Sequence, residues 1–306
     1  MTQPDSLPLS RLRRFLAICW LNLALASMAP AAAGEACPPA GYSREQLHEL
    51  KAKGFDISDR ATRHAFARGL VACLASPDPW LRDSIAFEAL SHLLRNHQLD
   101  ASTQSSLVDD VVPRLESPDP RGFERPFAAL VLSELVRADR MQPYFTGPRR
   151  KELMQRSIAY FRGVRDYRGF DDREGWRHGV AHGADLLLQW SLHPTIDRAT
   201  LLQIRDAIAG QIAPPGHAYI HGESERLARP ILAMAGRGVL SAQEWSDWFM
   251  RLVPKDAHLF DSQRGLALRH DVQAFLQAAY VNAKLDDDAT DEVLLPGLEA
   301  ALKAMP

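Results

Sequence analysis

The feature that most constrains this chain is a proline-rich tetrapeptide, SPDP, which occurs at 76–79 and again at 117–120. Each copy precedes a segment with a helical pattern, SIAFEALSHLLR after the first and PFAALVLSELVR after the second. Proline fixes φ and removes a backbone donor, so each copy ends one helix and permits another to begin. The copies lie 41 residues apart, and a helix pair that recurs at about 40–47 residues is typical of HEAT-like repeats.

Looser versions of the same helical pattern follow at irregular spacing, in GVAHGADLLLQW, RLARPILAMAG and DVQAFLQAAYVNA. Two capping boxes, Ser43 with Gln46 and Ser241 with Glu244, mark further helix starts. No stretch of four or more residues alternates polar and apolar side chains with β-branched enrichment, so no strand is expected. The sequence predicts an all-α fold, a HEAT-like α-solenoid or αα-superhelix of irregular helical-hairpin repeats, with a non-repeating helical bundle as the alternative.

The first 33 residues have the pattern of a secretory signal peptide. Three arginines precede the apolar run FLAICWLNLALA, and alanines with A-x-A spacing come just before Gly34. The alternative is an uncleaved membrane anchor, but Asn22 and Pro30 interrupt the run and its purely apolar part is short for a span. A lipoprotein is disfavoured because Glu35 stands where a small residue is expected before Cys37. We expect Sec-type cleavage of residues 1–33, which leaves 34–306 as a single all-helical repeat domain in the periplasm or outside the cell.

The charge of the expected mature chain argues against two kinds of partner. Removal of 1–33 takes away three arginines and one aspartate, so the 36 basic and 38 acidic residues of the whole chain become 33 and 37. A nucleic-acid partner would require a basic face, and none is expected here. There is also no basic patch for anionic lipid, so membrane contact is expected only through the signal segment, if it stays uncleaved.

Two cysteines, Cys37 and Cys73, remain after the expected cleavage. In an oxidising compartment such a pair can form a disulfide. The alternative is a pair of free or buried thiols, because spacing along the chain does not place two Cα atoms within bonding reach.

The stretch GWRHGVAHGAD, 175–185, carries the strongest functional signal. On a helix drawn through it, five polar residues fall within a stripe about 80° wide: Glu174, His178, His182, Asp185 and Gln189. Gly179 and Gly183 each cost about 1 kcal/mol against alanine in a helix interior. We expect close approach of a neighbouring element to offset that cost and to build a crevice beside the stripe.

Histidines at i and i+4 can offer two imidazoles to one divalent metal ion such as zinc, so His178 and His182 are candidate metal ligands. Asp185 is then a candidate third ligand or a residue that orients a ring. The motif differs from the zincin pattern, because Gly179 stands where that pattern has glutamate. The competing interpretation is a solvated polar face, although such faces favour lysine, glutamate and arginine over histidine.

A second histidine pair, His217 and His221, lies in PPGHAYIHGESE with Glu223 and Glu225 behind it. In a helical repeat, neighbouring units can bring the two pairs together. Arg226 and Arg229 follow on the next helix, where they either clamp an anionic group or pair with the glutamates of the same helix. Trp176 is either a core residue or a platform for a ligand. No nucleophile elbow, phosphate loop or dinucleotide fingerprint is present.

The stretch DYRGFDDREGWRHGVAHGAD resembles the signature of a bacterial family known as domain of unknown function 2785. That signature runs acidic, any residue, Arg, Gly and an aromatic, then Gly-Trp-x-His, then Ala-His-small-Ala-Asp. The matching positions are Asp166, Arg168, Gly169, Phe170, Gly175, Trp176, His178, Ala181, His182, Gly183, Ala184 and Asp185. The resemblance implies a helical fold over most of the expected mature chain and adds Asp166 and Arg168 to the candidate ligand-binding residues, but it brings no established activity.

Three functional hypotheses remain open from the sequence. The first is an exported scaffold whose His/Asp-lined groove binds a small molecule, a peptide, a glycan or another protein. The second is a hydrolase, in which His178 and His182 hold a metal or act as general base and Asp185 orients a ring. The third is purely structural, with both histidines bridging neighbouring loops. The candidate ligand-binding set is Asp166, Arg168, Trp176, His178, His182, Asp185, His217, His221, Glu223 and Arg226.

Overall fold

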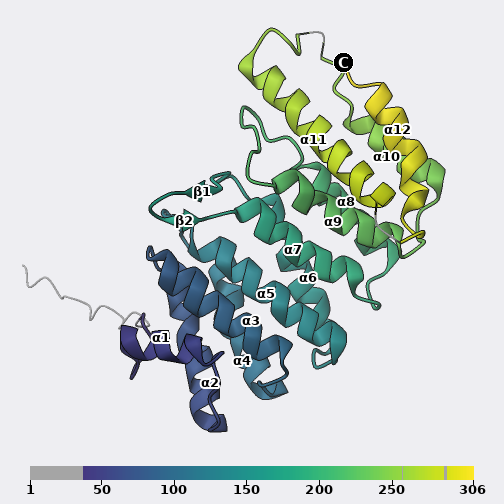
Figure 1. The fold of residues 1–306 in the computed structure, drawn as a ribbon. Coiled ribbons are helices and arrows are strands. Elements are labelled where there is room, and N and C mark those ends of the chain that lie inside the picture. Colours follow the sequence, from purple (N-terminus) through teal and green to yellow (C-terminus); the bar gives the residue numbers. More distant parts are fainter. Residues whose placement is uncertain (1–36, 257, 286–287) are drawn as a thin grey trace, which may run out of the picture. The chain divides into compact units, whose positions relative to one another are not determined.

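The computed structural model describes residues 37–256, 258–285 and 288–306, all of which fall in one compact unit. The predicted signal segment, 1–33, lies outside these residues. Helices supply nearly all the regular structure of the described part, in agreement with the predicted all-α class (Figure 1). None of the helices described there is long and apolar enough to cross a bilayer.

The α-helices and strands follow one another in the order α1 Arg44–Ala52, α2 Arg60–Gly69, α3 Glu88–Arg95, α4 Ala101–Val111, α5 Glu124–Met141, α6 Gly147–Arg162, β1 Phe170–Asp171, β2 Gly175–Trp176, α7 Gly179–Leu192, α8 Arg198–Ala209, α9 Glu223–Ala235, α10 Ala242–Leu252, α11 Gln263–Leu285 and α12 Leu295–Lys303. Within the described residues, three short 3₁₀ segments, η1 Leu70–Ala75, η3 Val112–Leu115 and η4 Glu292–Leu294, and one π-helical segment, η2 Trp80–Phe87, join them.

The odd-numbered helices from α3 to α11 form one continuous row, in which each helix packs on the next (Figure 1). The even-numbered helices α4, α6 and α8 pack beside their neighbours in this row, and α6 also packs against α8. Apolar side chains between the two sets make the core, with Phe161 and Trp190 among the largest that are fully buried. The Nε1–H of Trp190 donates to the Ser157 hydroxyl at 3.0 Å, which satisfies the polar group of that buried ring.

Side-chain caps fix where many of these helices begin. The capping boxes predicted at Ser43 and Ser241 are both confirmed, at the starts of α1 and α10. Asp59, Asp100 and Asp197 cap α2, α4 and α8 in the simpler way, each accepting a backbone N–H three residues further on. Each such cap contributes typically ~1 kcal/mol to the stability of its helix.

The prediction that the chain forms no strand is wrong at one place. β1 and β2 form a short antiparallel hairpin, with Phe170 opposite Trp176 and Asp171 opposite Gly175. The Asp171 carboxylate closes its turn by accepting the backbone N–H groups of Arg173 and Glu174, at 2.8 and 3.0 Å. Strands of two residues are too short to show an alternating pattern, so periodicity does not reveal them.

Cys37 and Cys73 form a disulfide, with their Cα atoms 5.0 Å apart. It joins the segment before α1 to the 3₁₀ segment η1, where Cys73 is fully buried. Of the two alternatives that the sequence left open for Cys37 and Cys73, the structure therefore shows the disulfide.

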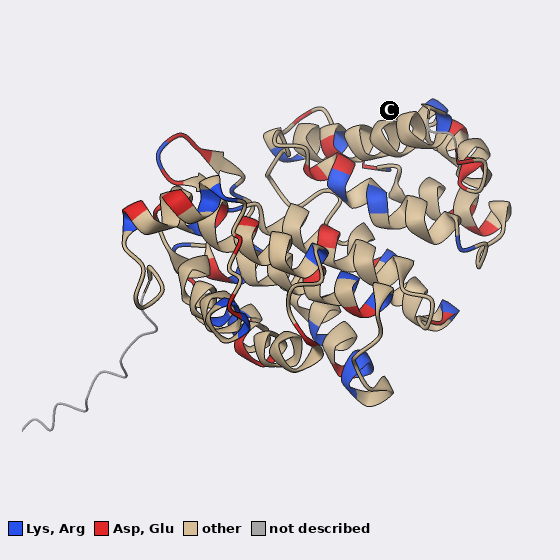
Figure 2. Cartoon of the chain, turned by 60° about the horizontal axis from the view of Figure 1, so that its bottom comes forward, with Lys and Arg blue, Asp and Glu red and all other residues tan. Residues whose placement is uncertain are grey.

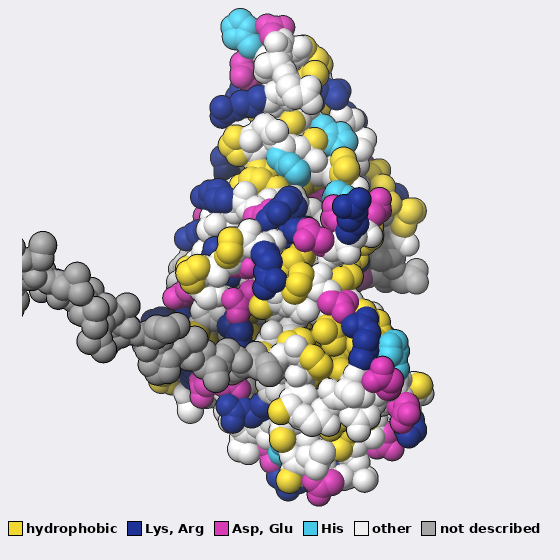
Figure 3. Space-filling model, turned by 90° about the vertical axis from the view of Figure 1, so that its left-hand side faces the viewer, with side chains coloured by type: hydrophobic (Ala, Val, Ile, Leu, Met, Phe, Trp, Pro, Cys, Tyr) yellow, Lys and Arg dark blue, Asp and Glu magenta, His cyan; other side chains and the backbone are white. Residues whose placement is uncertain are grey.

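Acidic and basic residues are interspersed along the helices instead of being separated by sign (Figure 2). The face drawn in Figure 3 likewise mixes charged side chains of both signs, histidines and small groups of hydrophobic side chains.

Candidate functional site

A cavity of about 730 Å³ lies along the row of odd-numbered helices. Its walls come from η2 and α3 on one side, from α5 and α7 in the middle, and from α9 with the loop before it on the other side. The lining residues are Asp83, Phe87, Arg95, Phe127, Leu130, Ser133, Glu134, Trp176, His178, His182, Asp185, Leu188, Gln189, His221, Gly222, Glu225, Arg226 and Arg229. Small-molecule sites have volumes in the range of about 300–1,000 Å³.

His178 is not on the helix that the sequence predicted through 174–189. Helix α7 begins at Gly179, and His178 is its N-cap residue, with φ of 57° and ψ of 38° in the left-handed region. The chain before it is held in the hairpin, because the backbone N–H of His178 donates to the Arg168 carbonyl at 3.1 Å. Glu174 consequently lies in the hairpin turn and does not join a helical stripe with His182.

The His178 ring is fixed from two sides. One face stacks on Trp176, with centroids 4.5 Å apart and an interplanar angle of 18°. Its Nε2 lies 3.1 Å from the His221 carbonyl oxygen and 3.6 Å from the buried carboxylate of Glu223. Burial lowers the pKa of His178, and although Glu223 opposes this shift, Arg226 adds to it. A neutral imidazole is therefore favoured at neutral pH.

His182 lies one turn into α7 and is buried next to His178, with ring centroids 5.7 Å apart. Its ring packs nearly perpendicular to that of Phe127 from α5, with ring centroids 5.0 Å apart. Its buried Nδ1 lacks a well-formed hydrogen bond among the described residues. Burial, with smaller effects from His178 and Arg226, lowers the pKa of His182 well below its ordinary value.

The glycines of α7 have two different roles. A Cβ on Gly183 would lie 2.5 Å from the Phe161 ring, so this position requires glycine for the approach of α6. A Cβ on Gly179 would meet no atom closer than 3.5 Å. The predicted close approach therefore holds for Gly183 only, and it involves an aromatic side chain on the α6 side.

Asp185 points to an arginine, and in the described part of the chain it makes no hydrogen bond or ion pair with His178 or His182. Its Oδ2 accepts a hydrogen bond from Nη1 of Arg226, which crosses from α9. Burial raises the pKa of Asp185 despite the neighbouring guanidinium groups of Arg226 and Arg229. Asp185 therefore holds α7 to α9 and is not placed to orient an imidazole ring.

A second carboxylate–guanidinium pair faces the same cavity from α3 and α5. Glu134 is almost fully buried, and both of its oxygens accept from Arg95, one of them from Nε at 2.9 Å. This pair was not among the residues predicted from the sequence. Each residue is one of several polar residues in the helical segment that follows an SPDP copy, and the two lie 39 positions apart, about one repeat.

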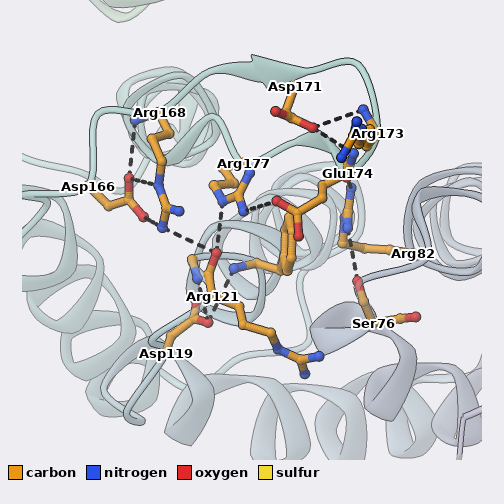
Figure 4. A network of polar contacts seen from close by, with 12 residues as sticks. Ser76, Arg82, Asp119, Arg121, Asp166, Arg168, Asp171, Arg173, Glu174 and Arg177 are labelled. Carbon is orange, nitrogen blue, oxygen red and sulfur yellow. Dashed lines mark hydrogen bonds and ion pairs between the residues drawn. The ribbon is translucent and has the colours of Figure 1, made fainter.

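The structure places Asp166 and Arg168 outside the cavity, in a polar network behind the hairpin (Figure 4). The two residues pair with each other, with Nε of Arg168 2.8 Å from Oδ1 of Asp166. The Arg121 carbonyl accepts from both Arg168 and Arg177, at 3.2 and 2.8 Å. Asp166 and Arg168 therefore anchor the hairpin to the loop before α5.

The second histidine pair divides between two environments. His221 lines the cavity, and its ring packs directly against Gly169. A Cβ on Gly169 would lie only 2.2 Å from Nδ1 of His221. His217 lies outside the cavity, with its ring centroid 5.6 Å from those of Tyr167 and Tyr219. Glu223 lies behind the wall, where its Oε2 accepts the backbone N–H of His221 at 2.9 Å.

The candidate metal ligands do not form a complete set. Among the residues that the structure describes, no three His, Cys, Asp or Glu side chains are arranged to hold a metal ion. His178 Nε2 contacts a carbonyl oxygen and Asp185 is paired with Arg226, so the predicted pair lacks the third ligand suggested from the sequence.

These features define a mainly helical protein with a cavity lined by charged residues and buried histidines. The chain belongs to the family described as "Protein of unknown function (DUF2785)", whose model matches residues 112–281. The matched range includes α5, the hairpin, α7 and α9, which supply most of the cavity wall. No curated protein and no solved structure matches the chain.

Proposed function

We propose that this protein is an exported HEAT-like helical-repeat scaffold that binds a small polar ligand in the cavity between α3 and α9. The continuous row of odd-numbered helices, flanked by the even-numbered ones, supports the repeat interpretation. Residues 34–306 then form a single repeat domain that follows a signal peptide.

The disulfide supports export. Disulfides persist in oxidising compartments and are rare in the cytosol, and Cys37 lies just after the predicted cleavage site before Gly34. The proposed location is therefore the periplasm or the exterior. Mass spectrometry of protein from cells that express the full-length chain tests this. A mature N-terminus near Gly34 and a mass increase on alkylation only after reduction are expected, and an intact N-terminus with free thiols would contradict export.

The observation that carries the binding proposal is the burial of two acids, Glu134 and Asp185, on the wall of one cavity. Each is held by an arginine from the neighbouring helix. Burying a carboxylate has a desolvation cost that offsets much of its attraction to an arginine, and here both arginines stay partly exposed. Polar groups that converge in a cavity are instead a marker of a binding site. The proposed contact residues are Trp176, His178, His182, Asp185, His221 and Arg226.

A ligand screen followed by NMR tests the proposal. We expect a bound compound to shift the imidazole resonances of His178 and His182, and to bind more weakly to an Arg226→Gln variant. Arg156→Gln is the matched control, because Arg156 pairs with Glu116 at 3.0 Å on the surface outside the cavity. Equal binding to both variants would place the ligand elsewhere and reject the cavity as its site.

A second candidate function is hydrolysis, which the contact between His178 and Glu223 favours. A neutral imidazole beside a buried carboxylate has the arrangement of a general base. In this version Glu223 takes the role that the sequence assigned to Asp185. Elemental analysis of chelator-free protein beside a His178→Ala, His182→Ala double variant tests the metal-dependent form, since equal and negligible metal in both would reject it. Loss of turnover in Glu223→Gln with unchanged folding would support the metal-free form.

A further inference from the structure

We propose that the ligand of this cavity is a short, neutral oligosaccharide. This inference rests on the proposed binding function and adds the chemical class of the ligand. It comes from the way the charges of the wall are paired.

Every carboxylate that lines the cavity has an arginine partner. Glu134 pairs with Arg95, and Asp185 pairs with Arg226. The two others are Asp83, 2.7 Å from Nε of the buried Arg82, and Glu225, 4.0 Å from Arg229. The lining residues include no lysine. The four acids are matched by four arginines when Arg82, which is buried behind the wall, is counted. The paired charges then have no excess of either sign, so a ligand with net charge would leave one charge without a partner.

The paired groups still have free hydrogen-bonding capacity. A guanidinium has five N–H donors and a carboxylate has about four acceptor positions. Arg226 uses one donor on Asp185, and Arg229 has no hydrogen bond in the described part of the chain. A hydroxyl group both donates and accepts, so it can accept from the arginine of a pair while it donates to the acid. Among neutral ligands, a sugar offers many hydroxyls in fixed positions.

Aromatic rings supply the second part of sugar recognition. Trp176 and Phe87 line the cavity and are only half-buried, and the C–H face of a sugar ring can pack on such surfaces. Trp176 is held in place by its stack on His178 and by Phe170, whose centroid is 4.9 Å away. A rigid ring loses little entropy when a ligand binds.

The spread of the ion pairs indicates more than one sugar ring. The pairs occur on successive helices from α3 to α9. Packed helices lie ~8–10 Å apart, and α3 and α9 are separated by three such steps in the row, which is more than the length of a single sugar ring. A chain of a few rings can contact both ends.

The test uses protein isolated from cells that express the full-length chain, and isothermal titration calorimetry. The neutral probes are maltotriose, cellotriose and tri-N-acetylchitotriose. The comparison probes are triglycine, a zwitterion, and inorganic phosphate, an anion. We expect at least one trisaccharide to bind. Glu225→Gln and Arg229→Gln should weaken that binding about tenfold, because each removes a charged hydrogen-bonding partner. Both side chains are largely exposed, so these variants fold. Arg156→Gln should bind as the unchanged protein does.

The outcomes separate the ligand class from the binding function. If triglycine or phosphate binds with loss in the Glu225 and Arg229 variants while no trisaccharide does, the saccharide proposal is overturned and the cavity remains a binding site. If no probe binds, or if binding is equal in all variants, both the saccharide class and the proposed binding site are overturned.

Discussion

Asp185 of α7 and Arg226 of α9 form an ion pair on the wall of the cavity, and Asp185 is the more deeply buried of the two. The acid that the sequence placed in a histidine stripe thus joins two helices. Because the pair is partly shielded from water, removing one partner leaves a charge poorly solvated.

Arg226→Gln should lower the free energy of unfolding by about 1–3 kcal/mol, because Asp185 then lacks its charged donor. Adding Asp185→Asn in the same chain should restore part of that loss, since no unpaired charge remains. Urea denaturation of the two single variants and the double variant measures the coupling. Strict additivity of the two changes would show that the pair contributes nothing.

The glycines of α7 predict opposite effects from the same substitution. Gly183→Ala puts a methyl group 2.5 Å from the Phe161 ring, and the resulting overpacking should cost about 1–3 kcal/mol. Gly179→Ala meets no atom closer than 3.5 Å, so the better helix propensity of alanine should leave stability unchanged or raise it by up to ~1 kcal/mol. Thermal unfolding of both variants measures the two effects. A similar loss of stability in each would contradict the packing described for Gly183.

Gly169→Ala should displace His221 from the cavity edge. A Cβ there would lie 2.2 Å from Nδ1 of His221, whereas a Cβ on Gly147 at the start of α6 would meet nothing within 4 Å. We expect the imidazole resonances of His221 to shift in Gly169→Ala and to stay unchanged in Gly147→Ala. Ligand affinity should fall in the first variant only. An unmoved His221 signal in Gly169→Ala would show that the hairpin yields instead of the ring.

His182 should make the protein less stable in mild acid. Burial lowers the pKa of His182 in the folded state below its ordinary value of 6.5, so the unfolded chain takes up a proton there that the folded chain does not. Stability should therefore fall as pH drops below 6.5, by at most about 1.4 kcal/mol per pH unit from this group. His182→Gln should flatten the curve. His258→Gln, which alters an exposed histidine, should leave it as it is. Parallel curves for the native chain and His182→Gln would refute this linkage.

The sequence predicted the helices well because their signals are local. SPDP, the capping boxes and the apolar faces each act within a turn or two of the chain, and the structure places helices where they indicate. The helix through His178 was wrong for a different reason. Hydrogen bonds from 177 and 178 to the carbonyls of 169 and 168 hold that segment in the hairpin, and pairing between segments leaves no periodic pattern.

For the site, the segment 166–185, which resembles the family signature, indicated His178, His182 and Asp185. It did not indicate the residues from other helices that line the same cavity. Arg95, Glu134 and Phe127 reach the cavity only because α3, α5 and α7 lie in one row. Asp166 and Arg168 belong to the same sequence signature, yet they lie behind the hairpin. The signature therefore indicated which segment of the chain contributes to the cavity, but it did not show which residues of that segment face the cavity.

The row of odd-numbered helices has a consequence for how the family can vary. Each odd-numbered helix from α3 to α9 supplies one strip of the wall, and ion pairs join α3 to α5 and α7 to α9. A relative that gains or loses one helix pair within this row changes the length of the cavity by a whole strip while keeping the local contacts of the rest. Cavity length can thus change in discrete steps, separately from the chemistry around His178 and His182.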